Sequence, residues 1–201
     1  MLRRWLPHAH ALTARLTRLR DRLAVHRARV DERGDPLIWA AVAVVLAPAP
    51  DSVLLIQRAE RAGDPWSGHM ALPGGRQDPA EPDLLVTAIR ETAEEVGLVL
   101  RAEQLIGSLD DVVPRTPALP PIAVRPYVFL LDHLPDLTLN LEVAAARWVP
   151  LETLLHPGNQ QPFLVEILGE TREFPAYRLD GSVVWGMTER ILSGLLEHVR
   201  P

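Results

Sequence analysis

The chain has 201 residues, 47% of them hydrophobic, and a formal net charge of −5. This length suits one domain with a sizeable core. Because there is no cysteine, disulfides, thiolate metal sites and a thiol nucleophile are excluded. Every basic side chain is arginine, so chemistry that depends on a lysine nucleophile is excluded too. No apolar run is long enough to cross a bilayer, and we expect a cytoplasmic protein without a nucleic-acid partner.

The first 33 residues differ in composition from the rest. They hold nine of the 21 arginines and only three acids. Apolar side chains recur here at spacings of four, three and four, which predicts an amphipathic helix: Leu12, Leu16, Leu19 and Leu23. We expect an Arg-rich helical extension at 1–33 and one main domain at 34–201. Four interpretations of the extension remain open: a helix packed on its own domain, a helix packed on a homodimer partner, an anion- or membrane-binding helix, and a transit peptide.

The main domain mixes strands and helices. In chain order the pattern predicts strands at 37–47 and 52–57, a helix from Asp83 to about 96 that ends at Gly97, strands at 105–113, 122–131 and 146–149, a helical turn at 151–155, a hairpin of 174–179 and 183–185, and a closing helix at 187–199. Since strands and helices do not alternate regularly, the order indicates an α+β fold or an α/β/α sandwich around a mixed sheet.

Three carboxylates lie close together on the helix that ends at Gly97. Glu91, Glu94 and Glu95 stand at i, i+3 and i+4, which places them along one stripe of the helix. Like charges at this spacing destabilise a helix, and a divalent cation removes the repulsion. Clustered oxygen ligands suit Mg²⁺ or Mn²⁺, which commonly share their coordination shell with substrate phosphates.

Together with the glycine turn before it, this helix resembles the Nudix box, G-x5-E-x7-R-E-U-x-E-E-x-G-U, where U is aliphatic. The matching positions are Gly75, Glu81, Arg90, Glu91, Glu94, Glu95, Gly97 and Leu98. Two positions depart from it: eight residues separate Glu81 from Arg90, and Thr92 stands where an aliphatic residue is usual. The extra residue is similar to the box of the coenzyme A pyrophosphatase branch. The resemblance implies the Nudix fold, with an α/β/α sandwich, and a metal-dependent pyrophosphohydrolase.

The resemblance also implies roles for these residues. It assigns the metal to Glu91, Glu94, Glu95 and the backbone carbonyl of Gly75, and it gives Arg90 the role of orienting the first glutamate. Glu81 either supports the metal shell or is an ordinary loop acid. The general base is left open among three acids, Glu91, Glu94 and Glu142; the last follows Asn140 and Leu141 in a segment similar to one in the coenzyme A branch.

Similarity to the coenzyme A branch extends beyond the box, to residues 54–59, 68–75 and 184–188. It implies a small nucleotide-type substrate, and coenzyme A or an acyl derivative is the expected one. We assign substrate binding to four residues: Arg58, Arg61, Gly74 and Arg76. The stretch between Arg58 and Gly68 is one residue longer than usual, and Arg61 is expected to replace a basic residue missing from it. Alternatives are ADP-ribose, NADH or a (d)NTP as substrate, and a non-catalytic nucleotide-sensing module.

Several other residues have both a functional and a structural interpretation. Trp66 either stacks on a base or packs its loop, and His69 either contacts phosphate or is structural. Asp110 and Asp111 follow a predicted strand and either bind metal or substrate or serve the fold. We expect Trp39 and Trp185 to lie in the core.

Overall fold

The computed structural model describes residues 11–30, 38–63, 66–114, 121–167 and 169–200. Its helices are α1 (Ala14–Val25), α2 (Leu84–Val96), α3 (Leu151–Leu155) and α4 (Gly186–Val199), with 3-10 turns at Ala102–Gln104 and Pro157–Asn159. Its strands are β1 (Ile38–Ala47), β2 (Ser52–Arg58), β3 (Met70–Ala71), β4 (Gly74–Arg76), β5 (Leu105–Ser108), β6 (Ile122–Leu130), β7 (Val143–Pro150), β8 (Phe163–Ile167), β9 (Glu170–Phe174), β10 (Ala176–Leu179) and β11 (Ser182–Trp185). No helix in these described ranges is long and apolar enough to span a membrane.

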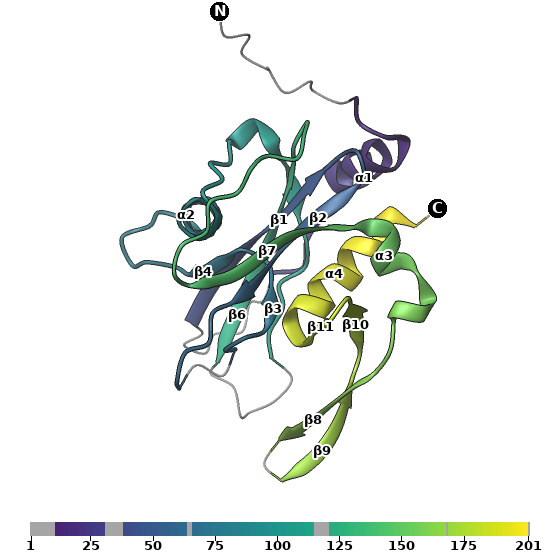
Figure 1. Ribbon diagram of the computed structural model, residues 1–201. Coiled ribbons are helices and arrows are strands. Elements are labelled where there is room, and N and C mark those ends of the chain that lie inside the picture. The colour runs from purple at the N-terminus through teal and green to yellow at the C-terminus, as the bar shows by residue number, and fades with distance from the viewer. Residues whose placement is uncertain (1–10, 31–37, 64–65, 115–120, 168, 201) are drawn as a thin grey trace, which may run out of the picture.

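A mixed sheet forms the centre of the fold (Figure 1). Strand β1 pairs in parallel with β6 and antiparallel with β2 and β4. Strand β2 also pairs with β3 and β7, and β5 pairs with the outer side of β6. Two separate hairpins, β8–β9 and β10–β11, follow in the C-terminal part of the chain. The predicted mixed sheet is therefore confirmed.

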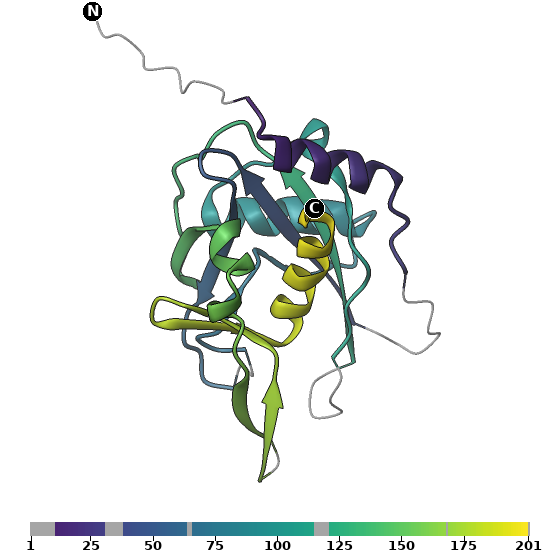
Figure 2. The same cartoon turned by 90° about the vertical axis from the view of Figure 1, so that its right-hand side faces the viewer.

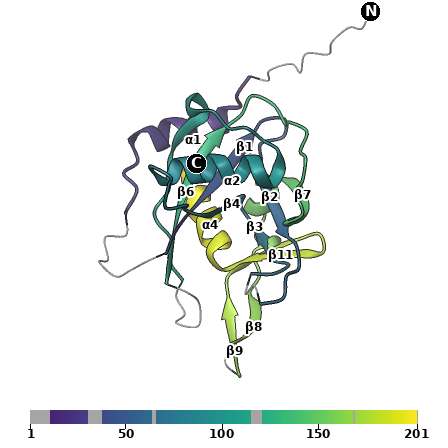
Figure 3. The same ribbon diagram turned by 90° about the vertical axis from the view of Figure 1, so that its left-hand side faces the viewer.

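Helices cover both faces of this sheet, which explains why β1 is apolar along its whole length. Ala41, Val45 and their odd-numbered neighbours pack in one core under α2 (Figure 3). The even-numbered Val44 and Leu46 pack in a second core with α1, α3 and α4, of which α1 and α4 lie together on that face (Figure 2). A strand buried on both faces reads as a continuous apolar run. The predicted α/β/α sandwich is confirmed.

Helix α1 packs on its own chain. Its stripe, Leu16, Leu19 and Leu23, is buried in the core shared with α4. A Cβ on Gly107 of β5 would stand 3.2 Å from the Cβ of Leu23, so the glycine permits a close approach of helix and strand. The helix starts after its cap, Thr13, whose side chain accepts the Leu16 N–H. It is shorter than the predicted 1–33, and the expected domain boundary between 33 and 34 lies outside the described residues.

Other elements differ from the prediction in length. The strand expected at 105–113 ends at Ser108, and only an isolated bridge at Val112 continues its pairing. Hairpin β8–β9 was not expected, and Phe174 ends β9 instead of starting the last hairpin. Pro175 separates these two strands because proline has no N–H for a continuous ladder.

Candidate active site

A glycine turn brings the chain from β3 against β1 and on toward α2. Gly74 has φ +153°, and a Cβ there would lie 2.3 Å from the carbonyl oxygen of Ala41, so no larger residue fits. Helix α2 then begins at the predicted cap, where the Asp83 side chain accepts the Val86 N–H at 3.0 Å. It ends at Gly97, which is left-handed as expected. These local signals fix which residues of α2 face the turn.

Two carboxylates of α2 lie directly against that turn. Glu95 is 3% exposed, and its Oε2 accepts the Gly74 N–H at 2.9 Å. A Cβ on Gly75 would stand 2.3 Å from Oε1 of Glu91, so that glycine gives the Glu91 carboxylate its space. Burial raises the pKa of Glu95 to about 7 and also raises the pKa of Glu91, and the negative charge of Glu142 adds to both effects. The pair is held where a positive charge would stabilise both.

Arg90 connects the remaining acids of the box. Its guanidinium donates to Glu81 at 2.7 Å, to Glu91 at 2.9 Å and to Glu94 at 3.1 Å. The bond to Glu91 is the contact expected of a residue that orients the first glutamate. Glu94 has 55% of its side chain exposed and turns to Arg90 rather than to the glycine turn.

Glu81 ties the loop before α2 to the helix. Its two oxygens accept bonds from Arg90, from the Thr87 hydroxyl at 2.6 Å and from the Asp78 N–H at 2.9 Å. The bond from Arg90 is the main reason why the pKa of Glu81 is lowered to about 2. Glu81 is therefore not an ordinary solvated loop acid, and it is linked through Arg90 to Glu91.

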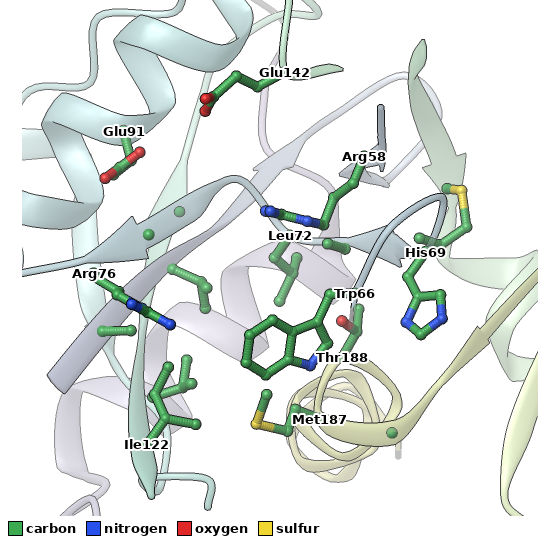
Figure 4. Close-up of a pocket in the computed structure, with 18 of the residues that line it drawn as sticks. Arg58, Trp66, His69, Leu72, Arg76, Glu91, Ile122, Glu142, Met187 and Thr188 are labelled. Carbon is green, nitrogen blue, oxygen red and sulfur yellow. The ribbon is translucent and has the colours of Figure 1, made fainter. Parts of the chain in front are cut away.

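A cavity of about 650 Å³ opens beside the buried Glu95 and the partly buried Glu91. Glu91, Glu95 and Glu142 line one end, and the predicted binding residues Arg58, Arg61, Gly74 and Arg76 line it as well. Figure 4 shows the guanidinium groups of Arg58 and Arg76 directed into the cavity. Glu142 stands on the loop before β7, and its carboxylate accepts a bond from Arg61 at 3.2 Å. The structure thus brings together every predicted site residue except Arg90 and Glu94, which lie behind the lining.

The other end of the cavity is mainly apolar. The Trp66 ring faces it, near Met187 and Ile122 (Figure 4). Trp185 also lines the cavity and is only partly buried, so its expected place in the core is wrong. Its ring contacts His69, with centroids 5.1 Å apart, and Phe163 and Phe174 of hairpin β8–β9. Met187, Thr188 and Ile191 of α4 complete this wall. The resemblance of residues 184–188 to the coenzyme A branch pointed to the first two, and nothing in the sequence analysis pointed to Ile191.

The remaining candidates serve the fold. Asp110 accepts bonds from the backbone and side chain of Arg29, which follows α1. Asp111 forms a two-bond pair with Arg125 of β6, at 2.9 and 2.8 Å. Trp39 is partly buried and packs against the core under α2, as expected, and the same Arg125 guanidinium lies over its ring.

The oxygen donors at the cavity are those that a divalent cation prefers. Within the described ranges no three carboxylate or imidazole side chains converge closely enough to hold a metal ion. Glu91 and Glu95 nevertheless form a pair of hard oxygen donors, withdrawn from water, beside the Gly75 backbone, which suits a divalent cation. These residues fit such an ion. Glu94 could become a further ligand only by breaking its bond to Arg90.

Comparison with known proteins identifies the relatives of this chain. The family model described as NUDIX domain matches residues 37–168. An uncharacterized protein of Schizosaccharomyces pombe is 44% identical over 113 residues, which are 54% of this chain but only 34% of that protein. A Nudix hydrolase NudL of Photorhabdus laumondii, also described as uncharacterized, is 30% identical over 80% of this chain and 84% of its own length.

Solved structures share the fold. A MutT/nudix family protein from Enterococcus faecalis aligns with a TM-score of 0.60 at 19% identity, over 82% of this chain and 62% of that one. The NUDIX domain of Shewanella oneidensis NrtR, crystallised with ADP ribose, aligns with a TM-score of 0.50 at 23% identity, over 67% of this chain and 84% of that one. At these identities the likeness concerns the fold, and it confirms the fold that the sequence predicts.

Proposed function

Because this chain belongs to the Nudix family, we propose that it hydrolyses the diphosphate of coenzyme A or an acyl-coenzyme A. The family match confirms the expected enzyme class, a pyrophosphohydrolase acting on nucleoside diphosphate derivatives. In the proposed reaction water adds to one phosphorus and the P–O–P bridge breaks. The products are 3′,5′-ADP and phosphopantetheine or its acyl derivative, and the two hydrogens of the water leave as protons at neutral pH.

One observation carries the proposal. Three segments outside the helix of the box resemble the coenzyme A branch, and all three contribute to the same cavity. Arg58 comes from the first segment, the Leu72–Gly75 turn from the second, and Trp185 to Thr188 from the third. Segments more than a hundred residues apart in the chain have no local reason to share one surface. Their convergence supports a common task in binding one substrate.

The distribution of charge in the cavity suits a substrate with a phosphate-rich part and an uncharged part. Arg58, Arg61 and Arg76 offer guanidinium groups beside the carboxylates, where they would bind phosphate oxygens. Arg61 is now paired with Glu142 in a largely exposed contact, so exchange for a phosphate costs little. The apolar wall around Trp66 and Met187 is suited to the adenine or to the pantetheine chain.

The chain's own residues divide the chemical work at the opposite end. Glu91, Glu95 and the Gly75 carbonyl would hold Mg²⁺ or Mn²⁺, with Arg90 fixing the direction of Glu91. When bound, such an ion neutralises phosphate charge and lowers the pKa of bound water. Glu142 lies at the same end of the cavity but on the loop before β7, outside the helix that would supply the ligands. We assign it the role of general base, accepting a proton from the attacking water at its carboxylate.

Product analysis tests this function. The purified protein is incubated with Mg²⁺ or Mn²⁺ and separately with coenzyme A, ADP-ribose, NADH and dNTPs, and products are resolved by chromatography. We expect 3′,5′-ADP from coenzyme A, and loss of turnover in Glu95→Gln. If AMP is released from ADP-ribose or NADH and no 3′,5′-ADP appears, the substrate assignment is refuted and the enzyme class stands. Binding of nucleotides without any turnover would identify a sensing module instead.

A further inference from the structure

The tip of the loop that carries Glu142 is exposed, between Leu137, which packs against the core under α2, and Val143, which is buried in it. Leu141, next to Glu142, is 98% exposed, and Leu139 is exposed as well. An apolar side chain in solvent contributes no packing that would fix the tip. Nevertheless Glu142 must stay over the cavity to reach a water near Glu91 and Glu95. The position of the backbone at the tip therefore depends on polar contacts as well as on the packing of its two ends.

Asn140 makes three of these contacts, one of which joins its carbonyl to the Val143 N–H at 3.3 Å. Its side-chain oxygen, Oδ1, accepts the Glu142 N–H at 2.9 Å. Its own N–H donates to the backbone carbonyl of Glu95 at 3.1 Å. One residue thus connects the backbone of the buried Glu95 to the backbone of Glu142 at the same end of the cavity. An asparagine bonding to the N–H two residues on forms an Asx turn, which sets the direction of the following chain.

The neighbouring contacts explain why the loop has little freedom on either side of Asn140. The Thr138 N–H donates to the Val96 carbonyl at 2.9 Å, and the Ala59 N–H donates to the Glu142 carbonyl at 2.8 Å. A Cβ on Gly97 would stand 3.0 Å from the Cβ of Thr138, so the glycine that ends α2 also lets the loop approach. Between these two fixed points, only the Asn140 side chain orients the amide of Glu142.

We propose that Asn140 is a positioning residue that holds Glu142 over the carboxylates of α2. This inference rests on the proposed function, because it takes Glu142 as the general base. Asn140 itself touches no reacting atom and acts through the Glu142 backbone. Removing its Oδ1 leaves the backbone contacts in place and removes the bond that orients the Glu142 amide.

Kinetics of matched variants test the role. In Asn140→Ala we expect kcat with coenzyme A and Mg²⁺ to fall about tenfold, with little change in KM and in thermal stability. Asn140→Asp keeps a side-chain oxygen that can accept the Glu142 N–H, so it should retain most of kcat. Asn140→Ser keeps an oxygen without adding a charge and should also retain part of kcat. Leu141→Ala, in the same loop but fully in solvent, should behave as wild type. Because Asn140 acts through Glu142, the double variant with Glu142→Gln should be no slower than Glu142→Gln alone.

Amide hydrogen exchange gives a readout that needs neither metal nor turnover. In the metal-free protein, the Glu142 amide of Asn140→Ala should exchange about fivefold faster, the factor expected for one lost hydrogen bond. Unchanged exchange and unchanged kcat in that variant would overturn the positioning role, as would multiplicative losses in the double variant. Full turnover in Glu142→Gln would instead overturn the base assignment in the proposed function, while the exchange result still reports on Asn140.

Discussion

Replacing Glu95 by glutamine is expected to stabilise the metal-free protein at pH 8. Glu95 is almost fully buried, and its pKa is about 7 rather than the usual 4.5. A raised folded-state pKa means that the folded protein binds this proton more tightly than the unfolded chain. The stability from this group is complete below about pH 4.5 and is lost as the pH rises through about 7. Above that pH the folded protein bears the whole cost of burying the charge.

The magnitude follows from the difference between the two pKa values. The two pKa values differ by roughly 2.5. Since one pKa unit corresponds to about 1.4 kcal/mol, the ionised carboxylate destabilises the metal-free fold by about 3 kcal/mol. Glutamine has the same size, carries no charge and keeps an oxygen for the Gly74 N–H. Glu95→Gln should therefore exceed the wild type by about 3 kcal/mol in free energy of unfolding at pH 8, and by little near pH 4.5.

Urea denaturation from pH 4.5 to 8 in the presence of EDTA measures this difference. Glu94→Gln is the matched control, since Glu94 is more than half exposed, and its loss should cost less than about 1 kcal/mol. Added Mg²⁺ should reverse the order, because the ion stabilises the wild type by mass action and binds the variant weakly. A Glu95→Gln variant no more stable than wild type at pH 8 without metal would show that the buried charge is already compensated within the protein.

Three further predictions concern the turn, the apolar wall and the first helix. Gly75→Ala places a methyl group 2.3 Å from the present position of Glu91 Oε1, so the Glu91 carboxylate must move. Turnover should then fall about 100-fold with little change in thermal stability, and a near-normal kcat would contradict this. Trp66→Ala should raise KM for coenzyme A about tenfold and change kcat less, as steady-state kinetics will show. Leu19→Ala should lower the unfolding free energy by about 2–5 kcal/mol in urea titrations, whereas a neutral result would place α1 outside the cooperative core.

The parts of the fold that sequence reasoning placed well are those governed by local signals. Helix α2 begins and ends as predicted because Asp83 and Gly97 supply a cap at each end, and both effects act within one turn. Strand β1 was recognisable because it is buried on both faces and reads as an unbroken apolar run. Neither inference needs knowledge of what packs against the element.

The direction of Glu94 shows where a spacing argument stops. At 3.6 residues per turn, Glu91 and Glu95 differ by about 40° around the helix, but Glu94 is about 100° from Glu95 and only about 40° from Arg90. All three glutamates belong to one broad stripe, so the sequence places them together. The choice of Glu94 between the cavity and the Arg90 guanidinium depends on side-chain rotamers and on whether a cation is present. No residue pattern contains that information.

The two ends of the cavity also differ in how well they can be predicted from sequence, and this difference bears on which substrate the protein binds. At the carboxylate end, the glycine turn, Glu91 and Glu95 come from one continuous segment, from Leu72 to Gly97, so this part can be recognised from one motif, and Glu142 joins it from the loop before β7. The apolar end combines Trp66 with Trp185 and Met187, more than a hundred residues later, and Trp185 is supported by hairpin β8–β9. Contacts over such distances are not encoded in any local pattern. Changes in these later segments can therefore alter the substrate without touching the residues that carry out hydrolysis, which is why the enzyme class follows from the motif and the substrate has to be argued from the assembled cavity.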